Sequence, residues 1–355
     1  MKITVLGAGT IGTAVAVDLA RDERVRRVQV CEARPAVLRT FRSAHAFPNL
    51  RTYEADARDA PSLEPIVSGS SVVVSCVGPE HSERLAKLAL DLGAHFVDLS
   101  GDVQSGLAEL AERRQRWVVS GAGLSPGLVG VLAMQGVESL DEAHAVRIRV
   151  GDVPITPPEP FLHRLAHSAE RLLDDYTCPA PVVRDGRLET REPLTGLELV
   201  EVDDFGTMEA FYTGAGLGAL VEALEGRVQR LSIKTLRYPG HAERMRFVLD
   251  LGMAERVSLD VRTHLTYRDV LARRIRQRLG GAYDDAVLLR VEVDGIRDGE
   301  TGMVIYEMVD RCDTEAGFSA MQRCTGFPAA TAAVLLAEKA LSGGGVGAAD
   351  QVLPR

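Results

Sequence analysis

The order of apolar and polar positions divides the chain into two halves with different patterns. In the first 120 residues, short apolar runs typical of strands alternate with stretches of helical periodicity. We expect strands at residues 2–6, 27–31, 50–54, 71–76, 95–98 and 117–119. Continuous apolar runs are typical of strands that are covered on both faces, so this half predicts a doubly wound parallel sheet of the α/β class.

After residue 120 the pattern changes. Alternation of apolar and polar positions is typical of strands with one exposed face, and it recurs at residues 145–150, 198–203, 227–238, 286–294 and 302–310. Residues 295–300 have the composition of a hairpin turn, and Thr266 with Asp269 fits a capping box at the start of a helix. This half therefore predicts a mixed, largely antiparallel sheet with a few helices.

The two patterns predict two domains. Residues 1–125 are expected to form a Rossmann domain, which an apolar helix at about 326–342 completes. Residues 126–325 are expected to form a second domain of the α+β class. The glycine run after Ser342 is expected to end the ordered chain.

The first strand leads directly into a glycine-rich turn. Gly7, Gly9 and Gly12 form a G-x-G-x-x-G motif between this strand and a helical pattern, which is the order of the dinucleotide-binding fingerprint. Gly7 permits the tight turn, Gly9 lets the backbone approach a pyrophosphate, and Gly12 lets helix and strand pack closely. The pyrophosphate would lie on the free N–H groups of the helix N-terminus. The alternative is a Rossmann-like domain that has kept the turn and lost its ligand.

Two acidic positions follow at the ends of later strands. Glu32 lies 20 residues beyond Gly12, where a carboxylate accepts hydrogen bonds from the adenosine ribose and repels a 2′-phosphate. This favours NAD as the cofactor, although Arg34 could hold the phosphate of NADP. The alternative is a solvated pair on a surface loop. Asp56 could contact the edge of the cofactor's adenine ring, or it could cap a turn.

Ligands of such sheets bind at the carboxyl ends of the strands, so residues 76–79, 98–102 and 121–127 should line one crevice. The glycine-rich loop 121–127 could direct backbone donors at the ligand or serve as an interdomain hinge. The residues expected to bind the cofactor are Gly7, Gly9, Thr10, Ile11, Gly12, Glu32, Arg34, Asp56, Cys76, Val77, Gly78, Pro79, Gly123, Leu124, Ser125 and Pro126.

Composition excludes several other classes of protein. The net charge of −9 over 355 residues argues against sequence-independent nucleic-acid binding. No apolar run approaches the roughly 20 residues of a membrane span, and the N-terminus enters a strand at once, which leaves no room for a signal peptide. The five cysteines are scattered, and no metal-ligand cluster such as H-E-x-x-H occurs. We therefore expect a cytoplasmic protein with free thiols and no bound metal.

Five stretches together resemble the saccharopine dehydrogenase superfamily, closest to its lysine 6-dehydrogenase branch. They occur in the order of that family and read VLGAG at 5–9, HFVDL at 95–99, AGLSPG at 122–127, KTLRYPGH at 234–241 and TGFPA at 325–329. The resemblance implies a Rossmann domain closed by a C-terminal helix, a second domain that binds substrate and dimerises, and an NAD(P)-linked reaction at a C–N bond of an amino acid or amine. The chain departs from the branch between residues 161 and 178, where His163, His167, Ser168, Asp175 and Tyr176 replace a Tyr and a Thr-Trp-Ser cluster, so the substrate stays open.

The candidate catalytic residues follow from this chemistry. Asp98 could hold a substrate ammonium or cap the next turn, and Arg237 could bind a substrate carboxylate through two hydrogen bonds or form a structural ion pair. His167, Tyr176 and His241 are candidates for proton transfer. The expected reaction is oxidative deamination of a terminal amine. One alternative is a reaction in the reverse direction, the reductive condensation of an amine with an oxo acid or aldehyde. The other is a non-catalytic dinucleotide-binding regulatory protein.

Overall fold

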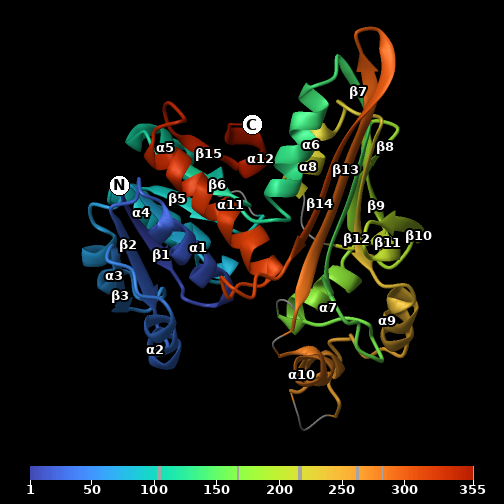
Figure 1. Cartoon of the computed structure of the whole chain (residues 1–355), viewed down its shortest axis with the longest axis horizontal. Coiled ribbons are helices and arrows are strands. Elements are labelled where there is room, and N and C mark those ends of the chain that lie inside the picture. The colour runs from blue at the N-terminus through green and yellow to red at the C-terminus, as the bar shows by residue number, and fades with distance from the viewer. Residues whose placement is uncertain (102–104, 166–167, 215–217, 261–263, 282, 355) are drawn as a thin grey trace. The chain divides into compact units, whose positions relative to one another are not determined.

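The computed structural model describes residues 1–101, 105–165, 168–214, 218–260, 264–281 and 283–354. The chain forms two compact units (Figure 1). Unit 1 comprises Met1–Met134 together with Gln322–Arg355, and unit 2 comprises Gln135–Met321. Unit 1 is therefore built from both ends of the sequence, and unit 2 from the middle.

In the described part of unit 1, seven strands form one sheet in the order β15-β6-β5-β4-β1-β2-β3, and every neighbouring pair is parallel. The strands are β1 (Lys2–Leu6), β2 (Arg27–Glu32), β3 (Leu50–Glu54), β4 (Val72–Ser75), β5 (His95–Asp98), β6 (Trp117–Ser120) and β15 (Gly345–Ala348). The chain passes from β1 outward to β3 and then back to β4 on the other side of β1. This reversal is the doubly wound arrangement that the sequence predicts.

Helices cover both faces of this sheet. They are α1 (Thr10–Arg21), α2 (Pro35–Ala44), α3 (Ala60–Val67), α4 (Ser82–Asp91), α5 (Ala108–Arg114), α11 (Ala320–Ala337) and α12 (Ala349–Val352). One hydrophobic cluster joins Val5 of β1 to Leu19 of α1 and Ala333 of α11, and a second joins Val73 of β4 to Leu85 of α4. Because α11 contributes to the first cluster, the end of the chain completes the core of its beginning.

The expectation that the ordered chain ends after Ser342 is wrong. Residues 345–348 form β15, which pairs in parallel with β6, and α12 follows it. The glycines permit this close packing, since a Cβ on Gly344 would lie 2.5 Å from the Ala111 carbonyl oxygen and one on Gly345 would lie 3.1 Å from the Trp117 ring. A glycine run of this kind therefore fits a narrow space between two elements.

Unit 2 is organised around a mixed sheet whose main path runs β10-β11-β12-β7-β13-β14, with β8 paired to β12 and to β9. Within the described residues, β12 and β7 are parallel and the other pairs are antiparallel. The strands are β7 (Glu142–Pro154), β8 (Ala180–Arg184), β9 (Arg187–Arg191), β10 (Glu198–Val202), β11 (Gly206–Tyr212), β12 (Arg230–Arg237), β13 (Asp285–Arg297) and β14 (Glu300–Arg311). The sequence predicts this class of sheet, but β8, β9 and β11 are missing from the expected strands.

The predicted hairpin and capping box are both confirmed. Asp298 and Gly299 connect β13 to β14, with φ of 55° and 81°, which is the left-handed backbone that a two-residue hairpin turn requires. Thr266 and Asp269 exchange side-chain and backbone hydrogen bonds at the start of α10. The helices of unit 2 are α7 (Ala169–Thr177), α8 (Gly218–Leu224), α9 (His241–Asp250) and α10 (Tyr267–Leu279), while α6 (Leu128–Glu138) crosses the boundary between the units.

Candidate functional site

The glycine turn of unit 1 has the geometry of a pyrophosphate cradle. Gly7 has a φ of +95°, and a Cβ on Gly12 would lie 2.0 Å from the Gly7 carbonyl oxygen. Space is open above Gly9, because the nearest atom to a Cβ placed there is Arg34 Nη2, at 4.0 Å. Gly9 is also the N-cap of α1, and no side chain caps this helix. The amides of its first turn therefore remain available to an anion, as a dinucleotide requires.

Glu32 ends β2 beside this turn and is 5% exposed. Its Oε2 accepts a hydrogen bond from the Ala8 amide at 3.0 Å, and its Oε1 accepts from the Arg34 amide and Nε at 3.0 and 2.8 Å. Burial works against the charge, but the hydrogen bonds from Arg34 and Ala8 together hold the pKa of Glu32 below its ordinary value. The carboxylate is thus ionised and fixed at the glycine turn, while the Arg34 side chain is 66% exposed.

Gly7, Gly9, Glu32 and Arg34 line one pocket of about 480 Å³. Four further predicted cofactor residues line it too, namely Asp56, Cys76, Val77 and Gly78. Thr10, Ile11, Gly12 and Pro79 do not, and neither does the group Gly123, Leu124, Ser125 and Pro126. Eight of the sixteen expected positions therefore line this cavity, and the other eight do not.

Sequence reasoning missed several lining residues, among them Arg58 and His81. Arg58 donates from Nε to Asp56 Oδ1 at 3.1 Å and from Nη2 to Asp56 Oδ2 at 2.7 Å, and these hydrogen bonds lower the pKa of Asp56 to about 2. The signal was present in the sequence, because Arg58 follows Asp56 by two positions as Arg34 follows Glu32. Two acid–arginine pairs therefore lie on this pocket, at the ends of adjacent strands.

The loop at 121–127 closes on itself. The Gly123 amide donates to the Pro126 carbonyl at 3.1 Å, and a Cβ on Gly127 would lie 2.0 Å from the Gly123 carbonyl oxygen. Asp98 caps its own turn, because its two carboxylate oxygens accept from the Ser100 amide at 3.0 Å and the Ser100 hydroxyl at 2.8 Å. The 121–127 loop and the Asp98 carboxylate are thus both hydrogen-bonded within unit 1. Asp102, the last residue of the expected 98–102 segment, lies outside the described residues.

Unit 2 brings three of the predicted catalytic residues together. Tyr176 of α7 and His241 of α9 are buried, with the Tyr176 hydroxyl 2.8 Å from His241 Nε2. His241 Nδ1 lies 2.6 Å from the Phe161 carbonyl oxygen, which can only accept, so Nδ1 carries the proton and Nε2 accepts from Tyr176. Burial and then the nearby Arg237 charge lower the pKa of His241 to about 3. Its imidazole is therefore neutral.

Arg237, at the end of β12, completes this group. Its Nε donates to the Tyr176 hydroxyl at 3.3 Å, and its Nη1 donates to the carbonyls of Asp152 and Leu236 at 3.1 and 2.9 Å. Its Nη2 lies 3.3 Å from Asp152 Oδ1, and both side chains are buried. A substrate carboxylate that bound Arg237 would have to replace Asp152 as its partner.

Two buried residues of this group were absent from the predicted catalytic set. His163 is fully buried, with its ring centroid 5.4 Å from that of His241, and Asp152 is 7% exposed. Asp152 lies more than 80 positions from Arg237, and no local spacing connects them. We refer to Tyr176, Arg237, His241, Asp152 and His163 as the buried polar cluster. His167, also a predicted catalytic residue, lies outside the described residues.

Neither a metal-binding cluster nor a membrane-crossing helix occurs within the described ranges. No group of three or more His, Cys, Asp or Glu side chains is arranged to hold a metal ion. No helix there combines the length and the apolar character that crossing a membrane requires.

A doubly wound parallel sheet with a glycine turn and a carboxylate at the end of its second strand defines the class of NAD(P)-binding oxidoreductase folds. The family model of the saccharopine dehydrogenase NADP binding domain matches residues 3–120, and that of the saccharopine dehydrogenase C-terminal domain matches residues 123–355. The chain belongs to the saccharopine dehydrogenase family, as the sequence motifs predict.

Two solved structures show the same fold at low sequence identity. Apo histidine-tagged saccharopine dehydrogenase (L-Glu forming) from Saccharomyces cerevisiae is 17% identical, with 98% of this chain and 94% of that chain covered and a TM-score of 0.81. Homospermidine synthase from Legionella pneumophila, in complex with NAD, is 13% identical, with 99% and 86% covered and a TM-score of 0.65. These similarities establish the fold, and the chemistry must be argued from the sites.

Proposed function

We propose that this protein is an NAD(P)-dependent dehydrogenase of an amino acid or diamine and deaminates a terminal amine oxidatively, as a lysine 6-dehydrogenase does. The observation that carries this proposal is the pocket at the glycine turn, in a chain of the saccharopine dehydrogenase family. Uncapped first-turn amides and the fixed Glu32 carboxylate fit a dinucleotide. The buried polar cluster of unit 2 supports amine chemistry, because it contains groups that can bind a carboxylate and move a proton.

A bound nicotinamide cofactor supplies the hydride acceptor for such a reaction. The protein would hold the cofactor's pyrophosphate on the amides of residues 9–12 and its ribose on Glu32. Gly123, Leu124, Ser125 and Pro126 would contact the cofactor elsewhere, outside the pocket that Glu32 lines. In this proposal NAD is preferred, since the ionised Glu32 repels a 2′-phosphate, and Arg34 and Arg58 are the groups through which NADP could still bind.

The proton of the substrate amine would leave through the buried polar cluster. Tyr176 donates to the unprotonated Nε2 of His241, so its hydroxyl can pass a proton to the imidazole while it accepts another on its oxygen. Arg237 donates to the same oxygen and stabilises negative charge on it. Asp98 would hold the substrate ammonium, and His167 remains a further candidate for proton transfer.

The second candidate is reductive condensation of an amine with an oxo acid or aldehyde. It is favoured by the names of the two proteins that share the fold, a saccharopine dehydrogenase and a homospermidine synthase. The two candidates differ in their co-substrate. Condensation oxidises NAD(P)H only when amine and carbonyl compound are both supplied.

Absorbance at the NAD(P)H band tests both candidates on one purified sample. Formation of NAD(P)H with a member of a panel of diamines and diamino acids supports deamination, and its consumption only with both co-substrates supports condensation. If neither occurs while calorimetry detects tight NAD(H) binding, the protein is a dinucleotide-binding regulator and the proposal is wrong. The Tyr176→Phe variant should lose turnover and still bind NAD(H), because its hydroxyl lies in unit 2.

We further propose a cytoplasmic homodimer. Support comes from the five cysteines, all of which are free thiols, and from the apolar side chains exposed along β14, at Met303, Ile305 and Val309. Light scattering of the purified chain measures its mass, and a monomer at micromolar concentration would contradict the dimer.

A further inference from the structure

Unit 2 contains a second pocket, of about 260 Å³, whose lining is strongly basic. Four arginines from four different strands line it, together with the hydroxyl-bearing residues Tyr212 and Ser232. The arginines are Arg147 of β7, Arg184 of β8, Arg191 of β9 and Arg230 of β12. No carboxylate belongs to the described lining. We call this the arginine pocket.

The charge of the arginine pocket is only partly balanced by neighbouring acids. Arg184 lies 3.8 Å from Asp185, whose side chain is 88% exposed, and Arg191 lies 3.3 Å from the half-exposed Glu189. Contacts of this length between exposed groups are weak in water. Among the described residues, Arg230 has no acidic partner within ion-pair distance.

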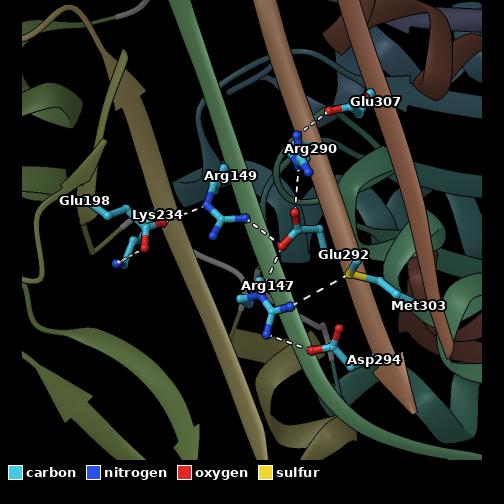
Figure 2. Close-up of polar contacts among 9 residues, drawn as sticks. All are labelled: Arg147, Arg149, Glu198, Lys234, Arg290, Glu292, Asp294, Met303 and Glu307. Carbon is cyan, nitrogen blue, oxygen red and sulfur yellow. Dashed lines mark hydrogen bonds and ion pairs between the residues drawn. The ribbon is translucent and has the colours of Figure 1, made fainter. Parts of the chain in front are cut away.

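Arg147 connects the pocket to a network of ion pairs along the same face of the sheet (Figure 2). It contacts Glu292 at 3.0 Å and Asp294 at 2.7 Å. Four cations and four carboxylates balance one another in this network, which consists of Arg147, Arg149, Lys234, Arg290, Glu198, Glu292, Asp294 and Glu307. The network therefore has no surplus carboxylate with which to neutralise the other three arginines of the pocket.

The arginine pocket is distinct from the buried polar cluster. Arg230 begins β12 and Arg237 ends it, and seven residues of extended strand span about 23 Å. A ligand in the pocket would thus touch neither Tyr176 nor His241. This inference goes beyond the proposed function and holds whether or not the protein is a dehydrogenase.

We propose that the arginine pocket binds a small anion with at least two negatively charged oxygens, either a polycarboxylate or a phosphate compound. A guanidinium presents parallel N–H donors that match the two oxygens of a carboxylate or phosphate, and several forks around one recess favour more than one anionic group. The Tyr212 and Ser232 hydroxyls can supply neutral hydrogen bonds. The volume lies just below the range of pockets for drug-sized ligands, which suits a ligand of metabolite size.

Isothermal titration calorimetry of the full chain with citrate and with inorganic pyrophosphate tests this proposal and distinguishes the two chemical sources. We expect saturable binding of at least one of them, with the stronger ligand identifying the preferred source. Arg230→Gln should weaken that binding about tenfold or more, because one charge-assisted fork is lost. Arg230→Lys keeps the charge without the fork and should weaken it less.

The matched control is Arg273→Gln, since Arg273 is an exposed arginine of α10 that does not line the pocket. It should leave the affinity unchanged, and circular dichroism should show the same folded content in all variants. Absence of saturable heat at millimolar concentrations would overturn the proposal. An affinity that is unchanged in Arg230→Gln would also overturn the proposal, because it would mean that the anion binds elsewhere, as pyrophosphate could at the glycine turn of unit 1. A loss of dimer mass in Arg230→Gln without any anion binding would assign these arginines to contacts between copies of the chain instead.

Discussion

At the scale of single residues, the proposed function assigns to Glu32 the choice between NAD and NADP in the pocket of unit 1. We predict that Glu32→Gln raises the affinity for NADPH relative to NADH about tenfold or more. The amide removes the negative charge that repels a 2′-phosphate and releases Arg34, which now donates to Glu32 at 2.8 Å, to bind that phosphate. Fluorescence titration with both reduced cofactors measures the ratio.

The control for this change is Asp56→Asn, which neutralises the other carboxylate of the same pocket. Asp56 is held by Arg58 at the end of the next strand, so we expect a smaller change in the ratio. An unchanged ratio in Glu32→Gln would mean that Glu32 shapes the glycine turn, through its bond to Ala8, without selecting the cofactor.

His241 makes unit 2 sensitive to acid. Its pKa is 6.5 in an unfolded chain and is lowered to about 3 by burial, so between these values the unfolded state binds a proton that the folded state does not. The free energy of unfolding must then fall as the pH falls through this window, by up to about 1.4 kcal/mol per pH unit from this group.

We predict that His241→Gln reduces this acid dependence, although it lowers stability at pH 7 by about 1–3 kcal/mol because Tyr176 loses its partner. Urea unfolding followed by circular dichroism at pH 7, 6 and 5 measures both effects. His264→Gln, which removes an exposed histidine, controls for the loss of any imidazole. A variant with the same slope as the parent protein would show that the acid dependence arises elsewhere.

The residues of the sites differ in how far sequence could identify them. Glu32 and Gly12 follow from a fixed spacing, and Arg237 and His241 lie in one stretch, KTLRYPGH, that resembles the family's sequence. Asp152 and His163 carry no such signal. They join the cluster only because β7 lies beside β12 in the sheet and α9 packs beside residue 161, and such pairings between distant segments are not encoded in local periodicity.

At the scale of elements, the unit of β1, glycine turn and α1 depends on a contact that only glycine permits. We predict that Gly12→Ala abolishes most dinucleotide binding and lowers the stability of unit 1 by about 1–3 kcal/mol. Its Cβ would lie 2.0 Å from the Gly7 carbonyl oxygen, so the turn or the helix must shift. Calorimetry with NADH and thermal unfolding measure the two losses.

Gly302→Ala is the matched control, since a Cβ at this position on β14 meets no atom within 4 Å. It should bind NADH as the parent does and unfold at the same temperature or slightly above. Normal NADH affinity in Gly12→Ala would contradict the assignment of this turn to pyrophosphate binding.

Sequence predicts best those strands that are buried on both faces of a sheet, because their residues are mostly apolar. The sequence predicts the buried parallel strands β1, β4 and β5, and the valine run of β4 is typical of a strand covered on both faces. Strand β9, RLETR, is almost wholly exposed, so its sequence lacks the alternation of apolar and polar positions that would predict a strand. Strand β15, GVGA, has the composition of a flexible end, and only its neighbours Trp117 and Ala111 make it a strand.

At the scale of the whole molecule, unit 1 is assembled from two segments separated by the entire unit 2. Residues of α11 lie in the same hydrophobic cluster as those of β1 and α1, so the first 134 residues alone would leave much of that core exposed. The pocket at the glycine turn lies in the N-terminal segment, and the core beneath it is completed by the C-terminal segment. The affinity for the cofactor should therefore depend on whether the C-terminal segment is folded against unit 1.

We predict that removing residues 343–355 leaves unit 2 folded but exposes the edge of β6, shifts the tryptophan emission to longer wavelength and lowers the melting temperature of unit 1. Trp117 is the single tryptophan of the chain and begins β6, and Gly345 of β15 pairs with it and packs against its ring. Loss of β15 therefore brings water to the indole ring. A shorter truncation that removes only residues 354–355 should leave the spectrum unchanged, because β15 and α12 remain. If the longer truncation kept the parent's emission and melting temperature, the pairing of β15 with β6 would contribute nothing to unit 1.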